Sequence, residues 1–407
     1  MRTDIVHPGA GELKYEIRAI VARAKEVEAR GTPITWENIG DPVAKGEHPP
    51  EWLRDIVASA AREGATFAYS PTQGLDATRE YIARERNLEG GIQITKNDIL
   101  FYNGLGDSIA HLYGNLHPKA RVIGPDPSYP THSSHEAAHA NAPHITYALD
   151  PTRGWEPDLV DLEAKLNAHP DIAGIVIINP DNPTGFVYPP ETLRAIVALA
   201  KKYNLFIISD EIYSNLAYPD SRMQKLASVI GDVPGLALRG ISKEFPWPGA
   251  RCGWVEFYNR DKDENFNRYA QSLIEAKMLE VCSTTLPQYV IPTVMSAPRY
   301  YPYLAERIAR YDERSRYAHQ ELSTVPGLII HKARGAFYMS AVFMPARDDK
   351  KFVYDLLEST GVCVVPLSSG FNSRLTGFRF TLLEPNQATF EKTIATLKAA
   401  ASVREHI

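Results

Sequence analysis

Residues 240–253 read GISKEFPWPGARCG, a stretch that holds one lysine, Lys243, and one arginine, Arg251, eight positions later. A lysine amine that is held in a dry pocket can condense with an aldehyde to form a Schiff base. A nearby guanidinium offers a fixed fork of donors that suits a phosphate group. The stretch therefore predicts a binding site for a molecule that carries both an aldehyde and a phosphate, as pyridoxal phosphate does.

The other groups that this cofactor needs occur upstream. Its ring accepts electrons only while the pyridine nitrogen stays protonated, which requires a buried carboxylate partner. Asp210 follows the apolar run 205–208 and so stands at the carboxyl end of an expected strand, where open α/β sheets bind ligands. Tyr213 follows closely enough to reach the phenolic oxygen of the ring. Asn182 offers an amide donor in the proline-rich turn INPDNPTG, which follows the apolar run 172–178.

With these motifs the chain resembles the class I/II aminotransferases of the aspartate aminotransferase superfamily, which are pyridoxal phosphate enzymes of fold type I. The resemblance extends from Ile39 to Arg379 and rests on INPDNPTG, SDEIY and ISKEFPWPGAR, in that order and at typical separations. It implies five cofactor-contacting positions: Asn182, Asp210, Tyr213, Lys243 and Arg251. The catalytic residues among them are expected to be Lys243, which forms the Schiff base and moves the proton, Asp210 and Tyr213.

Four further positions match the family pattern. Tyr69 in YSPTQG matches a tyrosine that reaches the phosphate in the partner subunit, which implies a homodimer with shared active sites. Tyr129 in DPSYPTH matches the aromatic ring that stacks on the cofactor, and His132 matches a histidine that supports the pyridinium-binding aspartate. Arg379 in GFRFTLL matches the arginine that clamps the substrate carboxylate, beside Asn182 and the Gly40 of an IGDP motif.

The chain departs from the family at its phosphate site. Many members have a serine three residues before the lysine, where this chain has Gly240, and Ser242 is the nearest hydroxyl that can replace it. The phosphate loop reads NGLGDS, without the usual hydroxyl residue. Gly104, Leu105 and Gly106 still allow close backbone approach at the start of an expected helix, whose amides attract an anion. Backbone amides are therefore expected to hold the phosphate.

The order of the apolar runs predicts an α/β fold. Strand-like runs alternate with helix-like segments up to about residue 325, which indicates a mostly parallel seven-stranded sheet flanked by helices. The expected strands are 99–102, 120–123, 144–148, 172–178, 205–208, 236–241 and 254–257. The last follows its predecessor after too short a gap for a crossover helix and is expected to run antiparallel. Beyond a long helix at about 303–322, the pattern changes to that of a smaller α+β domain.

We therefore expect three parts. Residues 1–47 form an N-terminal arm and part of the small domain, residues 48–300 the large cofactor-binding domain, and residues 301–407 the small C-terminal domain.

Composition excludes several classes of partner. The chain has 407 residues, 44% of them apolar, and a net charge of -5, which favours neither nucleic acid nor a membrane surface. Its three cysteines form no metal or disulfide pattern, and no metal is expected. The N-terminus lacks the apolar core of a signal peptide. A cytoplasmic enzyme is the expectation.

Several alternatives remain at this stage. A C–S β-lyase shares the fold and most of these residues, and would release pyruvate, ammonia and a thiol without an oxo-acid acceptor. A non-catalytic regulator would carry an added DNA-binding segment. Single residues also have simpler explanations: Lys243 as a surface lysine, Asp210 as a helix N-cap, Asn182 as a turn residue and Arg379 as a strand-edge cation. The amino donor and the oxo-acid acceptor stay open, with an alanine, aromatic or broad specificity preferred and 2-oxoglutarate or pyruvate as the acceptor.

Overall fold

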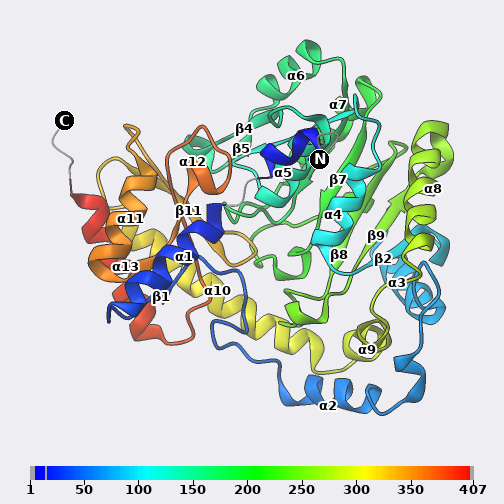
Figure 1. Ribbon diagram of the computed structural model, residues 1–407, viewed down its shortest axis with the longest axis horizontal. Coiled ribbons are helices and arrows are strands. Elements are labelled where there is room, and N and C mark those ends of the chain that lie inside the picture. Colours follow the sequence, from blue (N-terminus) through cyan, green and yellow to red (C-terminus); the bar gives the residue numbers. More distant parts are fainter. Residues whose placement is uncertain (1–4, 14–15, 404–407) are drawn as a thin grey trace.

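A large sheet of eight strands forms the centre of the computed structural model, which describes residues 5–13 and 16–403 (Figure 1). The order across the sheet is β2-β9-β8-β7-β6-β3-β4-β5. Strands β8, β7, β6, β3 and β4 run parallel, whereas β9 is antiparallel to both of its neighbours. The strands are β2 (Ile99–Tyr102), β3 (Arg121–Asp126), β4 (Thr146–Asp150), β5 (Glu156–Pro157), β6 (Ile172–Ile178), β7 (Phe206–Asp210), β8 (Gly235–Gly240) and β9 (Gly253–Tyr258).

This arrangement confirms the mostly parallel sheet and the antiparallel β9. The sheet has one strand more than the seven predicted, because the two-residue β5 pairs with the end of β4. A strand of two residues leaves no periodic pattern in the sequence.

Alternating side chains of the strands face two separate hydrophobic cores. Ile207 on β7 packs into one core with Leu193 and Ile196 of α7 (Pro190–Lys202). The next residue, Ile208, packs into the other core with α4 (Leu105–Gly114) and α8 (Glu264–Leu279). Helices therefore cover both faces, which is the layering that buried parallel strands require. The remaining helices of this part are α2 (Glu51–Ala60), α3 (Asp76–Leu88), α5 (Pro130–Ala140), α6 (Leu159–Ala168) and α9 (Thr285–Met295).

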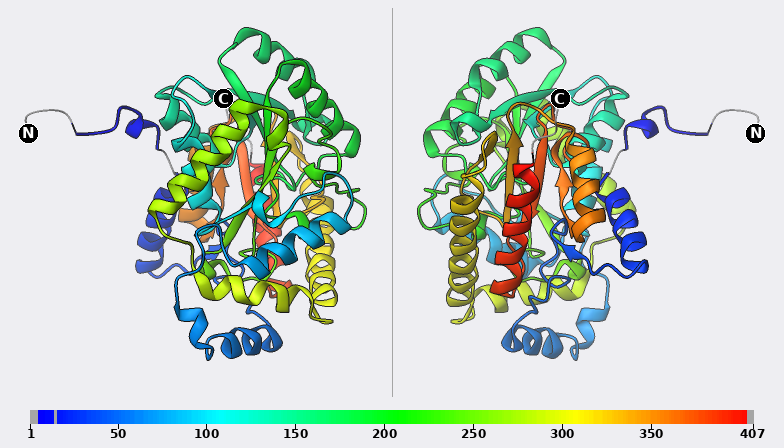
Figure 2. Two further views of the ribbon diagram at one scale, coloured as in Figure 1. Left: turned by 90° about the vertical axis from the view of Figure 1, so that its right-hand side faces the viewer. Right: turned by 90° about the vertical axis from the view of Figure 1, so that its left-hand side faces the viewer.

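A smaller antiparallel sheet of order β10-β11-β14-β13 lies beside the large one (Figure 1). Its strands are β10 (Leu328–Ile330), β11 (Tyr338–Phe343), β13 (Val365–Pro366) and β14 (Gly377–Thr381). Helices α10 (Tyr300–Leu322) and α13 (Gln387–Ser402) lie side by side against it (Figure 2). The other helices here are α11 (Asp349–Thr360), α12 (Leu367–Gly370) and α1 (Glu16–Ala29).

The N-terminal part of the chain joins the small sheet region. Strand β1 (Thr35–Trp36) pairs in parallel with β12 (Val362–Cys363), and α1 packs against α11. Residues that follow β1 contact both sheet regions, because the Gly40 carbonyl accepts from Lys243 and the Asn38 carbonyl accepts from Arg379 on β14. Among the described helices, none is both long and apolar enough to cross a membrane.

Candidate active site

Lys243 lies three residues beyond the end of β8, at the carboxyl edge of the parallel strands. Its Nζ donates a hydrogen bond of 2.6 Å to the carbonyl oxygen of Gly40, which comes from the N-terminal segment. Burial, together with the charges of Arg379 and Arg251, lowers the pKa of this amine to about 8, against the opposite effect of Asp41 and Asp210. The amine is thus partly neutral near neutral pH, as a nucleophile must be.

Asp210 is the last residue of β7 and is only 2% exposed. One carboxylate oxygen lies 3.3 Å from Nε2 of His132, and the other accepts the backbone amide of Ile212 at 3.1 Å. The hydroxyl of Tyr113 lies 3.1 Å from Nδ1 of the same histidine. When the His132 ring donates from Nε2 to Asp210, its Nδ1 can accept a hydrogen bond from the Tyr113 hydroxyl. Asp210 therefore caps the following turn and also ends a buried chain of hydrogen bonds that runs through His132 to Tyr113.

Tyr213 shares a hydrogen bond with Tyr338, the first residue of β11, across a hydroxyl separation of 3.0 Å. Burial raises the pKa of Tyr213 well above its ordinary value, so its hydroxyl remains a donor. The Tyr338 hydroxyl lies only 2.0 Å from the place that a Cβ on Gly40 would occupy. Gly40 is therefore needed for Tyr338 to enter the site, a requirement that its IGDP motif does not reveal.

Arg379 is buried on β14, opposite Ser340 of β11. Its guanidinium donates to the side-chain oxygen of Asn182 at 3.3 Å and to the backbone carbonyl of Asn38. The Tyr338 ring lies 4.5 Å from the guanidinium carbon, in a cation–π arrangement. A buried, oriented guanidinium of this kind is suited to bind a carboxylate in a bidentate manner.

Arg251 approaches the start of α4 from the end of the lysine loop. A Cβ on Gly104 would lie 2.6 Å from the Arg251 guanidinium, so only glycine fits there, and its φ of 86° also favours glycine. Leu105 and Gly106 are the first residues of α4, where backbone amides point outward without helical partners. Guanidinium and amides together form the cradle that a phosphate requires.

The remaining predicted residues are placed as follows. Tyr129 precedes α5, with its ring 6.5 Å from that of His132, and Ser242 is buried beside Lys243. Tyr69 is 83% exposed and lines a surface hollow with residues 282–286, so a single chain does not bring its side chain into the pocket. That hollow adjoins the phosphate cradle, because the hydroxyl of Thr284 donates to the Arg251 carbonyl at 3.0 Å.

Sequence reasoning missed three residues of this pocket: Asn38, Asp41 and Tyr338. Tyr338 reaches the site only through the pairing of β11 with β14, which no local motif encodes. Asn38 is 1% exposed, and neither polar atom of its side chain has a hydrogen-bond partner among the described residues. Buried polar groups normally have a partner, so this amide fits a pocket that receives a polar ligand.

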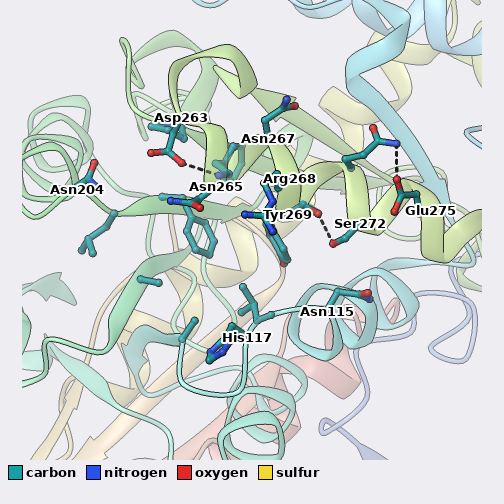
Figure 3. Close-up of a pocket in the computed structure, with 18 residues that line it drawn as sticks. Asn115, His117, Asn204, Asp263, Asn265, Asn267, Arg268, Tyr269, Ser272 and Glu275 are labelled. Atoms are coloured by element: carbon teal, nitrogen blue, oxygen red, sulfur yellow. Dashed lines mark hydrogen bonds between the residues drawn. The ribbon is translucent and has the colours of Figure 1, made fainter.

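Another hollow, with a volume of about 900 Å³, lies elsewhere. It is bordered by Ala120, Ala173 and Asn204, at the amino ends of the parallel strands, and by α8. Figure 3 shows the polar side chains that surround it, among them Asn115, Asn204 and Asn267. Ligands of open α/β sheets bind at the opposite, carboxyl edge, where Lys243 and Asp210 are found.

Comparison with known proteins agrees with this geometry. A family model of the class I and II aminotransferases matches residues 36–395. The chain belongs to this family. It is 52% identical to an uncharacterized aminotransferase of Methanocaldococcus jannaschii, over 98% of both chains. It is 30% identical to the glutamate-pyruvate aminotransferase AlaA of Escherichia coli, over 86% of both. The solved alanine aminotransferase of Pyrococcus furiosus superposes with a TM-score of 0.90 at 28% identity, over 99% of this chain and 100% of that one.

The protein is thus a fold type I, pyridoxal-phosphate-dependent aminotransferase, and the β-lyase alternative has no support among these relatives. The residues present fit the cofactor. The Gly104–Arg251 cradle suits its phosphate, the buried Asp210 suits its pyridinium nitrogen, and the partly neutral Lys243 amine suits its aldehyde.

Proposed function

We propose that this aminotransferase uses Lys243 as its Schiff-base lysine and transfers the amino group between glutamate and pyruvate, with alanine and 2-oxoglutarate as the products. One observation carries the assignment of the lysine. The Lys243 amine bonds to the Gly40 carbonyl, and the charges of Asp41, Asp210, Arg251 and Arg379 all act on its pKa, so the groups suited to pyridinium, phosphate and carboxylate lie in its neighbourhood. A surface lysine would have solvent in place of this surrounding.

When bound, pyridoxal phosphate supplies an electron sink for the bond that breaks at the substrate α-carbon. Arg379 binds the substrate carboxylate, and Asn182 holds the guanidinium in orientation. Arg251 and the first amides of α4 bind the phosphate. Asp210, oriented by His132, keeps the pyridine nitrogen protonated.

Lys243 is the residue that moves the proton. Its amine is the group placed to take a proton from the substrate α-carbon as a base and, once protonated, to give that proton up again as an acid. The Gly40 carbonyl orients the amine from one side. Tyr213 donates to the phenolic oxygen of the ring, since its raised pKa keeps the hydroxyl protonated.

The substrate assignment rests on the relatives. The E. coli relative is named a glutamate-pyruvate aminotransferase, and the P. furiosus neighbour an alanine aminotransferase.

Visible spectroscopy with an amino-acid panel tests the proposal. The purified holoenzyme should be yellow, lose its colour with alanine or glutamate, and recover it with pyruvate or 2-oxoglutarate. Lys243→Ala should abolish turnover, and normal rates in this variant would refute the lysine assignment. Bleaching by aromatic amino acids alone would refute the substrate assignment and leave the lysine assignment standing.

We further propose a cytoplasmic homodimer in which Tyr69 contributes to the partner's phosphate site. Large apolar side chains lie exposed around Tyr69 and the end of α8, including Phe67 and Leu279, the latter 90% exposed. Exposed apolar clusters of this kind mark interaction surfaces. The three cysteines Cys252, Cys282 and Cys363 are all free, as is usual in a reducing compartment.

Complementation between a variant of the lysine and a variant of Tyr69 tests the shared site. A heterodimer of a Lys243→Ala chain and a Tyr69→Phe chain contains one site with both native residues, if Tyr69 acts across the interface. Coexpression should therefore give more activity than either homodimer. Activity equal to the mean of the two homodimers, or an active monomer, would contradict the shared site.

A further inference from the structure

Arg307 on α10 is a buried arginine, 1% exposed, that contacts the backbone of the lysine loop. Its Nη1 donates to the carbonyl oxygens of Lys243 and Glu244, at 2.9 and 2.8 Å. Its Nε and Nη2 donate to the Glu47 carboxylate at 2.6 and 3.2 Å, and Nη2 also donates to the Tyr311 hydroxyl at 3.2 Å. All five N–H groups of the guanidinium are therefore used, which fixes it rigidly.

Glu47 ends the turn that begins at Gly40. Within this turn the Glu47 amide donates to the Pro42 carbonyl at 2.9 Å, and the Lys45 amide donates to the Asp41 carbonyl at 3.2 Å. Although burial alone would raise the pKa of Glu47, Arg307, Tyr311 and Arg310 together lower it below its ordinary value, so Glu47 is ionised. Charge-assisted, bidentate contacts of this type are the strongest that an arginine makes.

These contacts close a ring around a single residue. The Lys243 carbonyl is held by Arg307, which is held by Glu47, and the turn leads from Glu47 back to Gly40, whose carbonyl accepts the Lys243 amine. Both ends of the lysine, backbone and Nζ, are thus fixed to one another through two other segments of the chain. A long, flexible lysine side chain otherwise has considerable rotational freedom.

We propose that Arg307 and Glu47 are positioning residues for the aminotransferase reaction, which hold Lys243 at the geometry from which its amine moves the proton. This inference rests on the proposed role of Lys243. Neither residue touches the amine itself: they act through the lysine backbone and through the Gly40 turn. Misplacement of a catalytic group by about 1 Å can reduce a rate by about 100-fold.

A matched control lies two turns further along the same helix. Arg314 is also buried, and it donates to two backbone carbonyls, those of Leu382 at 2.9 Å and Pro385 at 3.1 Å. These carbonyls belong to the small domain and not to the lysine loop. Loss of the Arg314 guanidinium therefore perturbs the packing of α10 in a similar manner, but it leaves the hydrogen bonds to the Lys243 and Glu244 carbonyls in place.

The experiment compares Arg307→Lys, Glu47→Gln and Arg314→Lys by three measurements: kcat and KM separately, the pH midpoint at which the apoprotein binds pyridoxal phosphate, and Tm. Arg307→Lys should lower kcat by about 10- to 100-fold and change KM by less than about threefold. The pH midpoint should move upward, because a looser Lys243 is better solvated. Glu47→Gln should act in the same direction by a smaller factor, since the Arg307 carbonyl bonds survive.

Arg314→Lys should keep wild-type kcat and the wild-type midpoint even if its Tm falls. The inference is overturned if Arg307→Lys lowers Tm but leaves kcat and midpoint unchanged, or if Arg314→Lys reproduces its effects. Should Arg307→Lys not fold, Glu47→Gln decides by the same criteria. Lys243→Ala is measured alongside. Normal turnover in that variant would refute the proposed role of Lys243, whereas it would leave the observed contacts of Arg307 and Glu47 unchanged.

Discussion

Apoprotein that lacks pyridoxal phosphate should take up the cofactor with a pH dependence set by Lys243. Burial, Arg379 and Arg251 together lower the pKa of this amine to about 8, from 10.5 for an ordinary lysine. Only the neutral amine attacks the aldehyde, and its fraction is therefore about 10% at pH 7 instead of about 0.03%, an increase of about 300-fold. The uptake rate should rise about tenfold per pH unit below pH 7 and level off above the midpoint.

The assay follows the growth of the visible absorption band after mixing apoprotein with pyridoxal phosphate, from pH 6 to pH 10. Asp41→Asn provides the test of cause, because the Asp41 charge raises the pKa of Lys243. Its removal should move the midpoint to lower pH and accelerate uptake at pH 7. A wild-type midpoint near pH 10, or an upward shift in Asp41→Asn, would refute the argument, and Lys243→Ala should show no band.

Three further outcomes follow from the pocket and its surroundings. Tyr338→Phe removes the hydrogen bond to Tyr213, which is worth about 1 kcal/mol, so kcat should fall about fivefold. The phenylalanine ring keeps its place over Arg379, so the KM for alanine in steady-state kinetics should change little. A fivefold rise in KM would contradict this expectation. Burial raises the pKa of Asp181 to about 7, so the folded state retains a proton that the unfolded chain releases above about pH 4. The unfolding free energy should therefore fall as the pH rises from about 4 to about 7, by at most about 4 kcal/mol from this group, and denaturant titration of Asp181→Asn should show that much less pH dependence. Gly240→Ser should lower the unfolding free energy by about 1–3 kcal/mol because its Cβ would meet Cys252, Leu105 and Gly253 at 2.9–3.1 Å; an unchanged Tm with tighter cofactor binding would refute this.

The sequence predicted those parts of the fold that depend on local pattern. Strands β2 and β6 have the predicted ends, since each is a short apolar run followed by polar or proline residues. Helix α9 is not among the predicted elements, and Pro292 inside it argues locally against a helix, so tertiary packing must override the local preference there. The predicted domain boundaries at residues 47 and 300 remain a prediction, although β1 does pair with the small-domain strand β12.

The site residues also divide into those that a local motif predicts and those that only tertiary packing brings to the site. Lys243, Asp210 and Asn182 stand in motifs at strand ends, so their position along the chain already places them at one edge of the sheet. Other residues reach the site only through tertiary contacts. Tyr338 does so by the pairing of β11 with β14, and Asn38 by the bond from Arg379 to its carbonyl. Arg307 does so from α10, through its ion pair with Glu47. Contacts of this kind depend on packing between distant segments, and no spacing rule within a single segment encodes them.

The phosphate site illustrates how a departure from a family pattern can be consistent within one chain. A Cβ on Gly240 would lie 3.0 Å from the Leu105 side chain, and a Cβ on Gly253 would lie 2.7 Å from it. The Leu105 side chain thus packs against both glycines, and a serine at position 240 would also meet the Cys252 carbonyl at 2.9 Å and the Gly253 Cα at 3.1 Å. The two departures, a leucine in the phosphate loop and a glycine before the lysine, therefore lie in contact with each other and fit the same tight packing. Anion binding then depends on the amides at the start of α4 and on Arg251.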